Sequence, residues 1–237
     1  MFTTYTFSTR ECGGLILGGF LKISDLRIKL GSSLKSAEAV RPPQGLPTAY
    51  QELNQFLLWG GFPQGGLSLL RAAHGFGATA LWVSAARKLT QEKKWVCWLS
   101  PSQSLYPLTL QLQGLDLSFL WTAHQPFADK SWLWVLQELM NSELFSFIGC
   151  DLAENNFRAR QWLKLQKQAQ SAQVAIVFLQ RKNFSTQSPH CFSLIMEFNQ
   201  HHINIQRALH RSTPMHLSWR NLHAHFMPQL TPISPAS

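Results

Sequence analysis

The stretch LSLLRAAHGFGATAL, residues 67–81, decides the fold class of this chain. Its first six residues form an apolar run that predicts a buried strand, the glycines at positions 75 and 77 predict a tight turn, and the apolar residues that follow predict a helix. Elsewhere in the chain, short apolar runs alternate with helical segments in the same way. This alternation is typical of an α/β fold with a mainly parallel, twisted sheet and crossover helices.

The same periodicity predicts the other elements and the limits of the core. We predict strands at 67–72, 95–99, 117–122, 145–150 and 174–180, and helices near 78–90, 103–113, 130–141 and 153–169. After residue 180, the segments CFSLIMEF and INIQRAL alternate faces with a period of two, which predicts a C-terminal antiparallel hairpin. We therefore expect an N-terminal extension at 1–45, a core at 46–211 and a C-terminal tail at 212–237.

The composition fits a single domain with tails. The 237 residues are 45% hydrophobic, which is enough for one buried core. The hydrophobic runs are too short and too broken for a membrane helix. The four cysteines show no C-x-x-C spacing, so we expect reduced thiols and a cytoplasmic protein. A net charge of +9 is compatible with binding to nucleic acid or to an acidic partner.

Histidines gather late in the chain without forming a metal-binding pattern. Seven of the nine follow residue 189, but they lack the fixed offsets and the nearby cysteines or carboxylates of a zinc site. We therefore predict solvent-exposed histidines, no metal and no cofactor. The sequence also lacks a Ser-His-Asp set in a nucleophile-elbow context, which makes catalysis the weaker interpretation.

The turn between the predicted strand and helix has the position of a phosphate-binding loop but lacks its chemistry. In the pattern G-x-x-x-x-G-K-[ST], backbone amides surround the phosphates and the lysine reaches the β and γ oxygens. Here the diagnostic positions are Ala72, Gly77, Ala78 and Thr79, with Gly75 inside the turn. Each lost charge-assisted hydrogen bond is worth about 1.5–3 kcal/mol. We therefore predict weak triphosphate binding and weaker hydrolysis.

The flanking segments resemble the core of RecA-type ATPases. Upstream, LPTAYQELNQFLLWGGFPQGGLSLL, residues 46–70, is similar to the entry of that core, although Ala49 and Asn54 replace its usual Gly and Asp. Downstream, WVCWLSPSQSLYP, residues 95–107, resembles the second core strand and the segment that carries the water-activating glutamate. The resemblance places Ser102 at that glutamate position, and a serine cannot act as a general base at neutral pH.

Among inactive RecA-like chains, the ordered motifs resemble the ImuA family of translesion-synthesis accessory proteins. They are LPTA at 46–49, WVCWLSPSQSLYPLTLQLQGLDL at 95–117, RQWLKLQKQAQ at 160–170 and SPHCFSLIMEF at 188–198, and together they span about residues 45–211. The resemblance implies a RecA-like fold and an SOS-induced protein that binds an ImuB-like polymerase subunit, a RecA filament or both. SulA, the SOS division inhibitor, is similar over the WLSPSQ and later region.

Asp151 allows two interpretations. It closes the apolar run FSFIGC, as an aspartate that orients Mg²⁺ at a strand end would. It also precedes Glu154 and a helical run, which is the pattern of an N-cap with a capping-box partner. We favour the helix cap, because Ala78 leaves the turn without its lysine.

Basic residues offer a second candidate surface. Arg160, Lys164 and Lys167 follow i, i+4, i+7 spacing and share a helix face, which is either a solvated side or a contact for phosphate or an acidic partner. Late in the chain, Arg207, Arg211 and Arg220 add a basic patch that could contact DNA phosphates. Trp132 and Trp134 cannot both face the core of one helix. We therefore expect one of them to be exposed or covered by a partner.

Together these features predict a RecA-like domain that has kept the fold and lost the ATPase, and that acts by protein binding and by contact with DNA. The degenerate nucleotide site comprises Gly75, Gly77, Ala78, Thr79 and Asp151. Two alternatives stay open: a SulA-like inhibitor that binds the division GTPase FtsZ, and a weak residual ATPase.

Overall fold

The structure is a computed structural model. It describes residues 45–73, 75–101, 105–124, 129–152, 157–181, 190–200, 202–208 and 215–218. All of them belong to the unit Pro42–Ser237. The predicted N-terminal extension, except for Gly45, lies outside the described residues.

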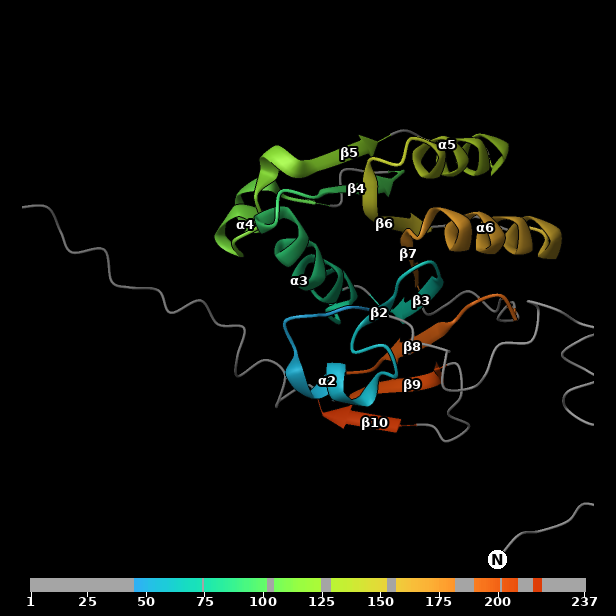
Figure 1. The fold of residues 1–237 in the computed structure, drawn as a ribbon. Coiled ribbons are helices and arrows are strands. Elements are labelled where there is room, and N and C mark those ends of the chain that lie inside the picture. Colours follow the sequence, from blue (N-terminus) through green and yellow to red (C-terminus); the bar gives the residue numbers. More distant parts are fainter. Residues whose placement is uncertain are drawn as a thin grey trace, which may run out of the picture. The chain divides into compact units, whose positions relative to one another are not determined.

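In this described part of the chain, eight strands form one sheet in the order β10-β9-β8-β3-β7-β6-β4-β5 (Figure 1). Neighbouring strands from β8 to β5 are parallel, and β9 and β10 continue the sheet antiparallel. The α/β fold and the C-terminal hairpin are thus confirmed. The strands are β3 (Leu67–Ala72), β4 (Trp95–Ser100), β5 (Leu120–His124), β6 (Phe145–Leu152), β7 (Ala175–Arg181), β8 (Leu194–Phe198), β9 (His202–Ala208) and β10 (Met215–Ser218).

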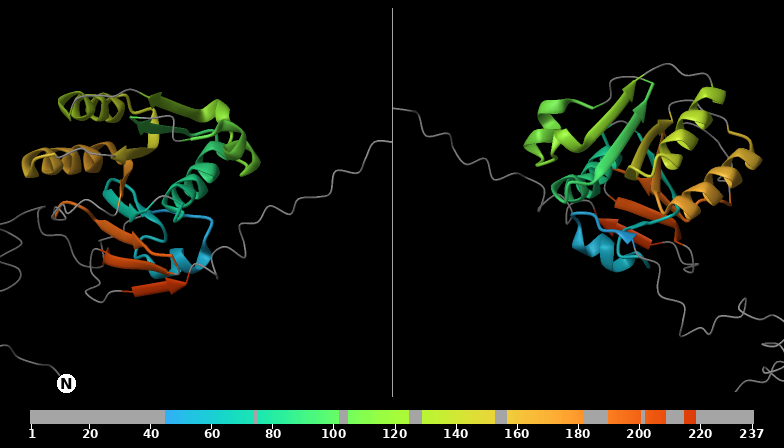
Figure 2. Two further views of the ribbon diagram at one scale, coloured as in Figure 1. Left: turned by 180° about the vertical axis from the view of Figure 1, so that it is seen from behind. Right: turned by 45° about the horizontal axis from the view of Figure 1, so that its top comes forward.

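Helices cover both faces of the sheet (Figure 2). One hydrophobic cluster contains residues of α2, α3 and α4, and the other contains residues of α5 and α6. A short antiparallel pair, β1 with β2, precedes the main sheet and was not predicted. These elements are β1 (Gly45–Leu46), α2 (Gln51–Phe56), β2 (Phe62–Pro63), α3 (Ala78–Gln91), α4 (Pro107–Leu112), the 3-10 helix η3 (Leu117–Phe119), α5 (Asp129–Asn141) and α6 (Ala159–Ala172).

Burial on both faces explains why the central strands are continuous apolar runs. In β4, Val96 and Trp98 belong to the cluster on the α3 side, whereas Cys97 and Leu99 belong to the cluster on the α5–α6 side. Successive side chains of a strand point to opposite faces, so a strand between two helical layers needs apolar residues at every position.

The α3 layer packs tightly against the sheet at Gly149 of β6. The rings of Trp82 and Trp98 lie 4.7 Å apart, and the ring of Trp82 stacks on Phe147 at 5.4 Å. A Cβ at Gly149 would lie 2.4 Å from Trp98 Cε3 and 2.6 Å from Trp82 Nε1. The strand therefore needs a glycine here so that the two indoles can approach its backbone.

Several predicted boundaries differ from the structure. Residues 117–119 form η3 before β5 begins, because Ser118 N–H donates to the Asp116 carboxylate at 3.0 Å. Helix α4 begins only at Pro107, a residue that favours a first helical turn. Strand β10 extends the sheet into 212–237, the segment assigned to a tail. Among the described residues, no helix is long and apolar enough to cross a membrane.

Candidate functional site

The turn after β3 has the backbone context of a phosphate-binding loop. Strand β3 lies between β7 and β8 inside the sheet, and its carboxyl end leads through the turn into α3. Gly75 and Gly77 have φ values of 82° and 86°, a left-handed conformation that glycine adopts without strain. Leu81 N–H donates to Gly77 O at 2.9 Å and starts the helix. The predicted strand–turn–helix geometry is thus present.

The chemistry of such a loop is absent at its key position. Ala78 is the first residue of α3, is only 5% exposed and packs in the core cluster on the α3 side. Its methyl group provides no positive charge toward the turn. Thr79 follows it and is half-buried. No side chain caps the first turn of α3, so its amides are the donors that an anion would meet. His74 lies outside the described residues.

Asp151 lies on a strand and is not a helix cap, so the capping interpretation was wrong. It pairs in register with Leu179 of β7, and α6 begins only at Ala159, where Arg158 N–H donates to Gln161 Oε1 at 2.6 Å. The local cap pattern fails because β6 continues its parallel pairing with β7 through Leu152. Glu154, the supposed capping partner, lies outside the described residues.

The register places Asp151 on the same side of the sheet as the turn. Gly149, two residues earlier, faces the indoles of the α3 layer, so Asp151 shares that face. Leu179 pairs with both Asp151 and Leu70 of β3. Two strand spacings therefore separate Asp151 from β3, about 10 Å. The structure thus brings together, at the carboxyl ends of the strands, the predicted residues Gly75, Gly77, Ala78, Thr79 and Asp151. The position of the lysine has no cation.

The cysteines near this edge are inert. Burial raises the pKa of the Cys97 thiol to about 12. Burial, together with the nearby Cys97 and Asp151, raises the pKa of Cys150 well above its usual value. Both thiols are therefore protonated at neutral pH and cannot act as nucleophiles. In the part of the chain that the structure describes, no group of three His, Cys, Asp or Glu residues could hold a metal ion.

The predicted basic residues divide into two groups. Arg160, Lys164 and Lys167 are exposed on α6, opposite its buried face of Trp162, Leu165 and Ala169, so the predicted stripe exists. Of the late arginines, Arg207 belongs to β9, where its backbone pairs with Ile195. Arg211 and Arg220 lie outside the described residues.

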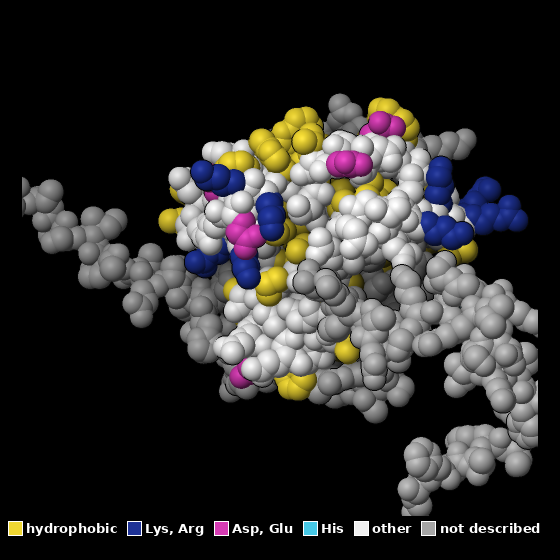
Figure 3. All heavy atoms as spheres, viewed as in Figure 1, with side chains coloured by type: hydrophobic (Ala, Val, Ile, Leu, Met, Phe, Trp, Pro, Cys, Tyr) yellow, Lys and Arg dark blue, Asp and Glu magenta, His cyan; other side chains and the backbone are white. Residues whose placement is uncertain are grey.

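An exposed apolar surface at the edge of the sheet was not predicted. Strand β5 ends the strand order and leaves Trp121 57% exposed. On the other face of the sheet, α4 is also apolar on several sides and buries only Leu110. Yellow side chains gather over β5 at the top of Figure 3. We call this surface the β5 surface; it is formed by the free edge of β5 and by Trp121, whose ring lies 6.1 Å from that of Phe145 of β6.

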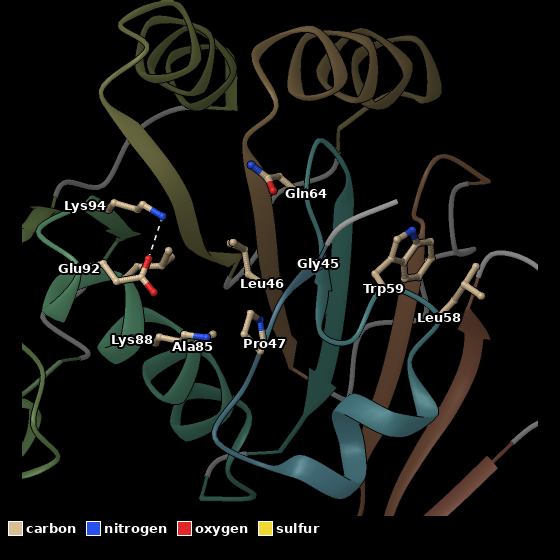
Figure 4. A pocket seen from close by; sticks show the side chains of 11 residues that line it. Gly45, Leu46, Pro47, Leu58, Trp59, Gln64, Ala85, Lys88, Glu92 and Lys94 are labelled. Atoms are coloured by element: carbon tan, nitrogen blue, oxygen red, sulfur yellow. Dashed lines mark hydrogen bonds and ion pairs between the residues drawn. The ribbon is translucent and has the colours of Figure 1, made fainter. Parts of the chain in front are cut away.

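A pocket of about 540 Å³ lies near the amino ends of the strands, at the end of the sheet away from the turn. It was also not predicted. Figure 4 shows Lys88, Glu92 and Lys94 on one side of it and Trp59 on the other. Lys94 Nζ donates to Glu92 Oε2 at 2.8 Å, and this bond lowers the pKa of Glu92. Because α3 ends and β4 begins at this end of the sheet, the pocket is remote from the turn. Its lining contains no Ser, Thr, Cys, Tyr or His.

No protein-family model matches the chain, and no curated protein matches it.

Proposed function

We propose that this chain is a non-catalytic, RecA-like accessory protein of SOS-induced translesion DNA synthesis, similar to the ImuA family, that acts by binding other proteins. The observation that carries this proposal is Ala78. A buried methyl group stands at the first position of α3, where a RecA-type ATPase has its lysine. The strand–turn–helix geometry around Ala78 is that of a nucleotide site, so what is missing is the charge that holds the triphosphate.

The loss of this charge has a measurable size. A lysine that reaches the β and γ phosphates makes charge-assisted hydrogen bonds worth about 1.5–3 kcal/mol each. Without them, the glycine turn and the amides of α3 can give only weak anion binding. A domain of this kind that does not hydrolyse nucleotide can still bind other proteins through its surface.

The β5 surface is our candidate for protein binding. An edge strand presents unpaired backbone N–H and C=O groups, which can pair with a strand of another chain. Trp121 lies on this strand, and exposed tryptophans are enriched among residues that dominate binding energy. By the resemblance, the partners would be an ImuB-like polymerase subunit, a RecA filament or both.

A pull-down with an ImuB-like subunit and with RecA filaments tests this proposal. We expect Trp121→Ser to weaken capture at least tenfold, because removing a hot-spot residue costs about 2 kcal/mol or more. Leu58→Ser is the matched control, since Leu58 is an exposed apolar residue that lines the remote pocket. Two outcomes would contradict the proposal: Mg-ATP turnover that disappears in Thr79→Ala, or capture of FtsZ together with cell filamentation on overexpression.

A further inference from the structure

The charged side chains on the outward face of α6 are all positive. Arg160, Lys164 and Lys167 are exposed there, and residues 159–172 contain no Asp or Glu. The stripe spans about 10 Å along the helix. Dark blue side chains gather over α6 at the right of Figure 3.

This stripe lowers the stability of its own helix. Arg160 and Lys164 are four residues apart, and Lys164 and Lys167 are three apart, so both pairs repel each other. A helix face that is merely solvated usually mixes both signs of charge, which gives attractive pairs instead. The lack of any acid on α6 therefore favours an anionic ligand over simple solvation.

An exposed tryptophan lies on the neighbouring helix. Helices α5 and α6 are in contact and lie side by side in both Figure 1 and Figure 2. Helix α5 buries Trp132, Leu136 and Met140, and Trp134 is 62% exposed on its other side. The prediction that Trp132 and Trp134 cannot both face the core is thus confirmed.

The two helices run in the same direction along the same face of the sheet. Both helices follow parallel strands, so both start at the carboxyl edge of the sheet and run back along one face. Trp134 is the sixth residue of α5, and Lys164 is the sixth residue of α6. Packed helices have axes about 8–10 Å apart. Trp134 therefore lies on the outward side of the helix next to the one that carries the basic stripe.

We infer that this outer α5–α6 face, formed by Trp134, Arg160, Lys164 and Lys167, binds single-stranded nucleic acid. Phosphates would contact the stripe, and a base would stack on Trp134; this combination is how proteins hold single strands without reading their sequence. A base inside a duplex is already stacked and could not use the indole. Among the described side chains of the two helices, Glu138 is the one acid. Glu138 lies on α5 one turn beyond Trp134 and would repel phosphates. The phosphates of a bound strand would therefore follow α6.

The inference rests on the proposed role in DNA synthesis, to which it adds a surface and a ligand class. It does not involve the β5 surface, so the two can be tested separately. Loss of nucleic-acid binding with normal capture of the protein partner would overturn this inference alone. Loss of partner capture with normal nucleic-acid binding would overturn only the proposed protein-binding role.

Fluorescence anisotropy of the full chain with labelled dT20 tests the inference. We expect Arg160→Gln/Lys164→Gln/Lys167→Gln to abolish most of the salt dependence, because three phosphate contacts make affinity fall about 20-fold between 50 and 200 mM salt. Trp134→Ala should weaken binding about tenfold, and Trp134→Phe should restore much of it. The control is Arg87→Gln/Lys88→Gln/Lys94→Gln, which removes the same charge from exposed residues at the other side of the sheet. It should bind as the wild type does.

Three arms separate the possible ligands. A duplex of equal length should bind more weakly than dT20, whereas U20 should bind through the same residues, and the tighter of the two single strands would identify the natural ligand. Polyglutamate should compete poorly at equal charge. Competition as strong as that of dT20 would overturn the inference in favour of an acidic protein partner. Equal binding of duplex together with an unchanged Trp134→Ala variant would overturn it as well.

Discussion

The turn after β3 and the outer α5–α6 face show opposite combinations of shape and chemistry. The turn has the strand–turn–helix backbone that phosphate-binding loops use, with Gly75 and Gly77 in left-handed conformations, but it has Ala78 at the position where such loops have a lysine. The α5–α6 face is an open surface without a turn around a ligand. It presents the three cations of α6 and the exposed indole of Trp134. A site for cleaving a small molecule needs both enclosure and preorganised charge. A surface for a long polymer needs only charge and stacking groups.

The largest expected difference between the two regions concerns stability. Trp82→Ala removes an indole that packs between α3 and the sheet, against Trp98 and Phe147. We expect it to lower the free energy of unfolding by about 3–5 kcal/mol. Trp134→Ala removes an exposed indole and should change it by less than about 0.5 kcal/mol. Urea unfolding of both variants measures the contrast, and equal losses would mean that Trp134 is part of the core.

A second experiment asks whether the turn lacks only its charge. We expect Ala78→Lys to strengthen Mg-ATP binding by at least tenfold, because the new ammonium can add hydrogen bonds worth about 1.5–3 kcal/mol. Hydrolysis should stay absent, since Ser102 provides no general base. Isothermal titration and a phosphate-release assay measure the two effects, with Ala80→Lys as the control one position outside the motif. Unchanged binding in Ala78→Lys would show that the shape of the turn has been lost too.

A third prediction concerns the buried, protonated thiol of Cys97 in β4. The pKa of Cys97 is raised to about 12 in the folded chain, against about 8.5 in an unfolded chain. Below pH 8.5 the thiol keeps its proton in both states, so its contribution to stability is complete. Between these values only the unfolded chain loses the proton, so stability falls by about 1.4 kcal/mol per pH unit.

Urea unfolding at pH 8 and pH 10 measures this loss. Cys97→Ala should have a shallower decline than the wild type, although its stability at pH 8 is lower. Burial also raises the pKa of Tyr50 to about 12 and the pKa of Cys150 well above its usual value, so part of the decline remains in the variant. An unchanged slope for Cys97→Ala between pH 8 and pH 10 would contradict a buried thiol.

The fold was predictable where local signals agree with long-range packing. The apolar run of β3, the glycines after it and the apolar face of α3 gave bounds that the structure confirms. Asp151 was assigned wrongly because a cap is a local pattern, whereas the pairing of β6 with β7 depends on a strand more than 20 residues away. The 3-10 turn at Asp116 likewise delayed β5.

The surfaces were harder to predict than the fold. An apolar residue such as Trp121 is expected in the core, and its exposure follows from the place of β5 at the end of the strand order. That order is a property of the whole sheet and leaves no local pattern. The stripe on α6 was predictable, because helical spacing alone puts Arg160, Lys164 and Lys167 on one face. Its neighbour Trp134 needed the contact between α5 and α6.

The smallest expected effect is a change in the free energy of unfolding on Lys164→Gln. Its sign shows whether the basic stripe of α6 supports the fold or is unfavourable for it. Lys164→Gln removes two repulsive pairs on α6, each worth about 0.2–0.5 kcal/mol, so it should raise the free energy of unfolding slightly. Lys88→Gln is a control of opposite sign, because Lys88 lies four residues before Glu92 and attracts it; that variant should become slightly less stable. Urea unfolding at low salt, with replicates, resolves the two signs. If Lys164→Gln were instead destabilising, Lys164 would support the fold, and its loss in binding assays would no longer argue for contact with phosphate.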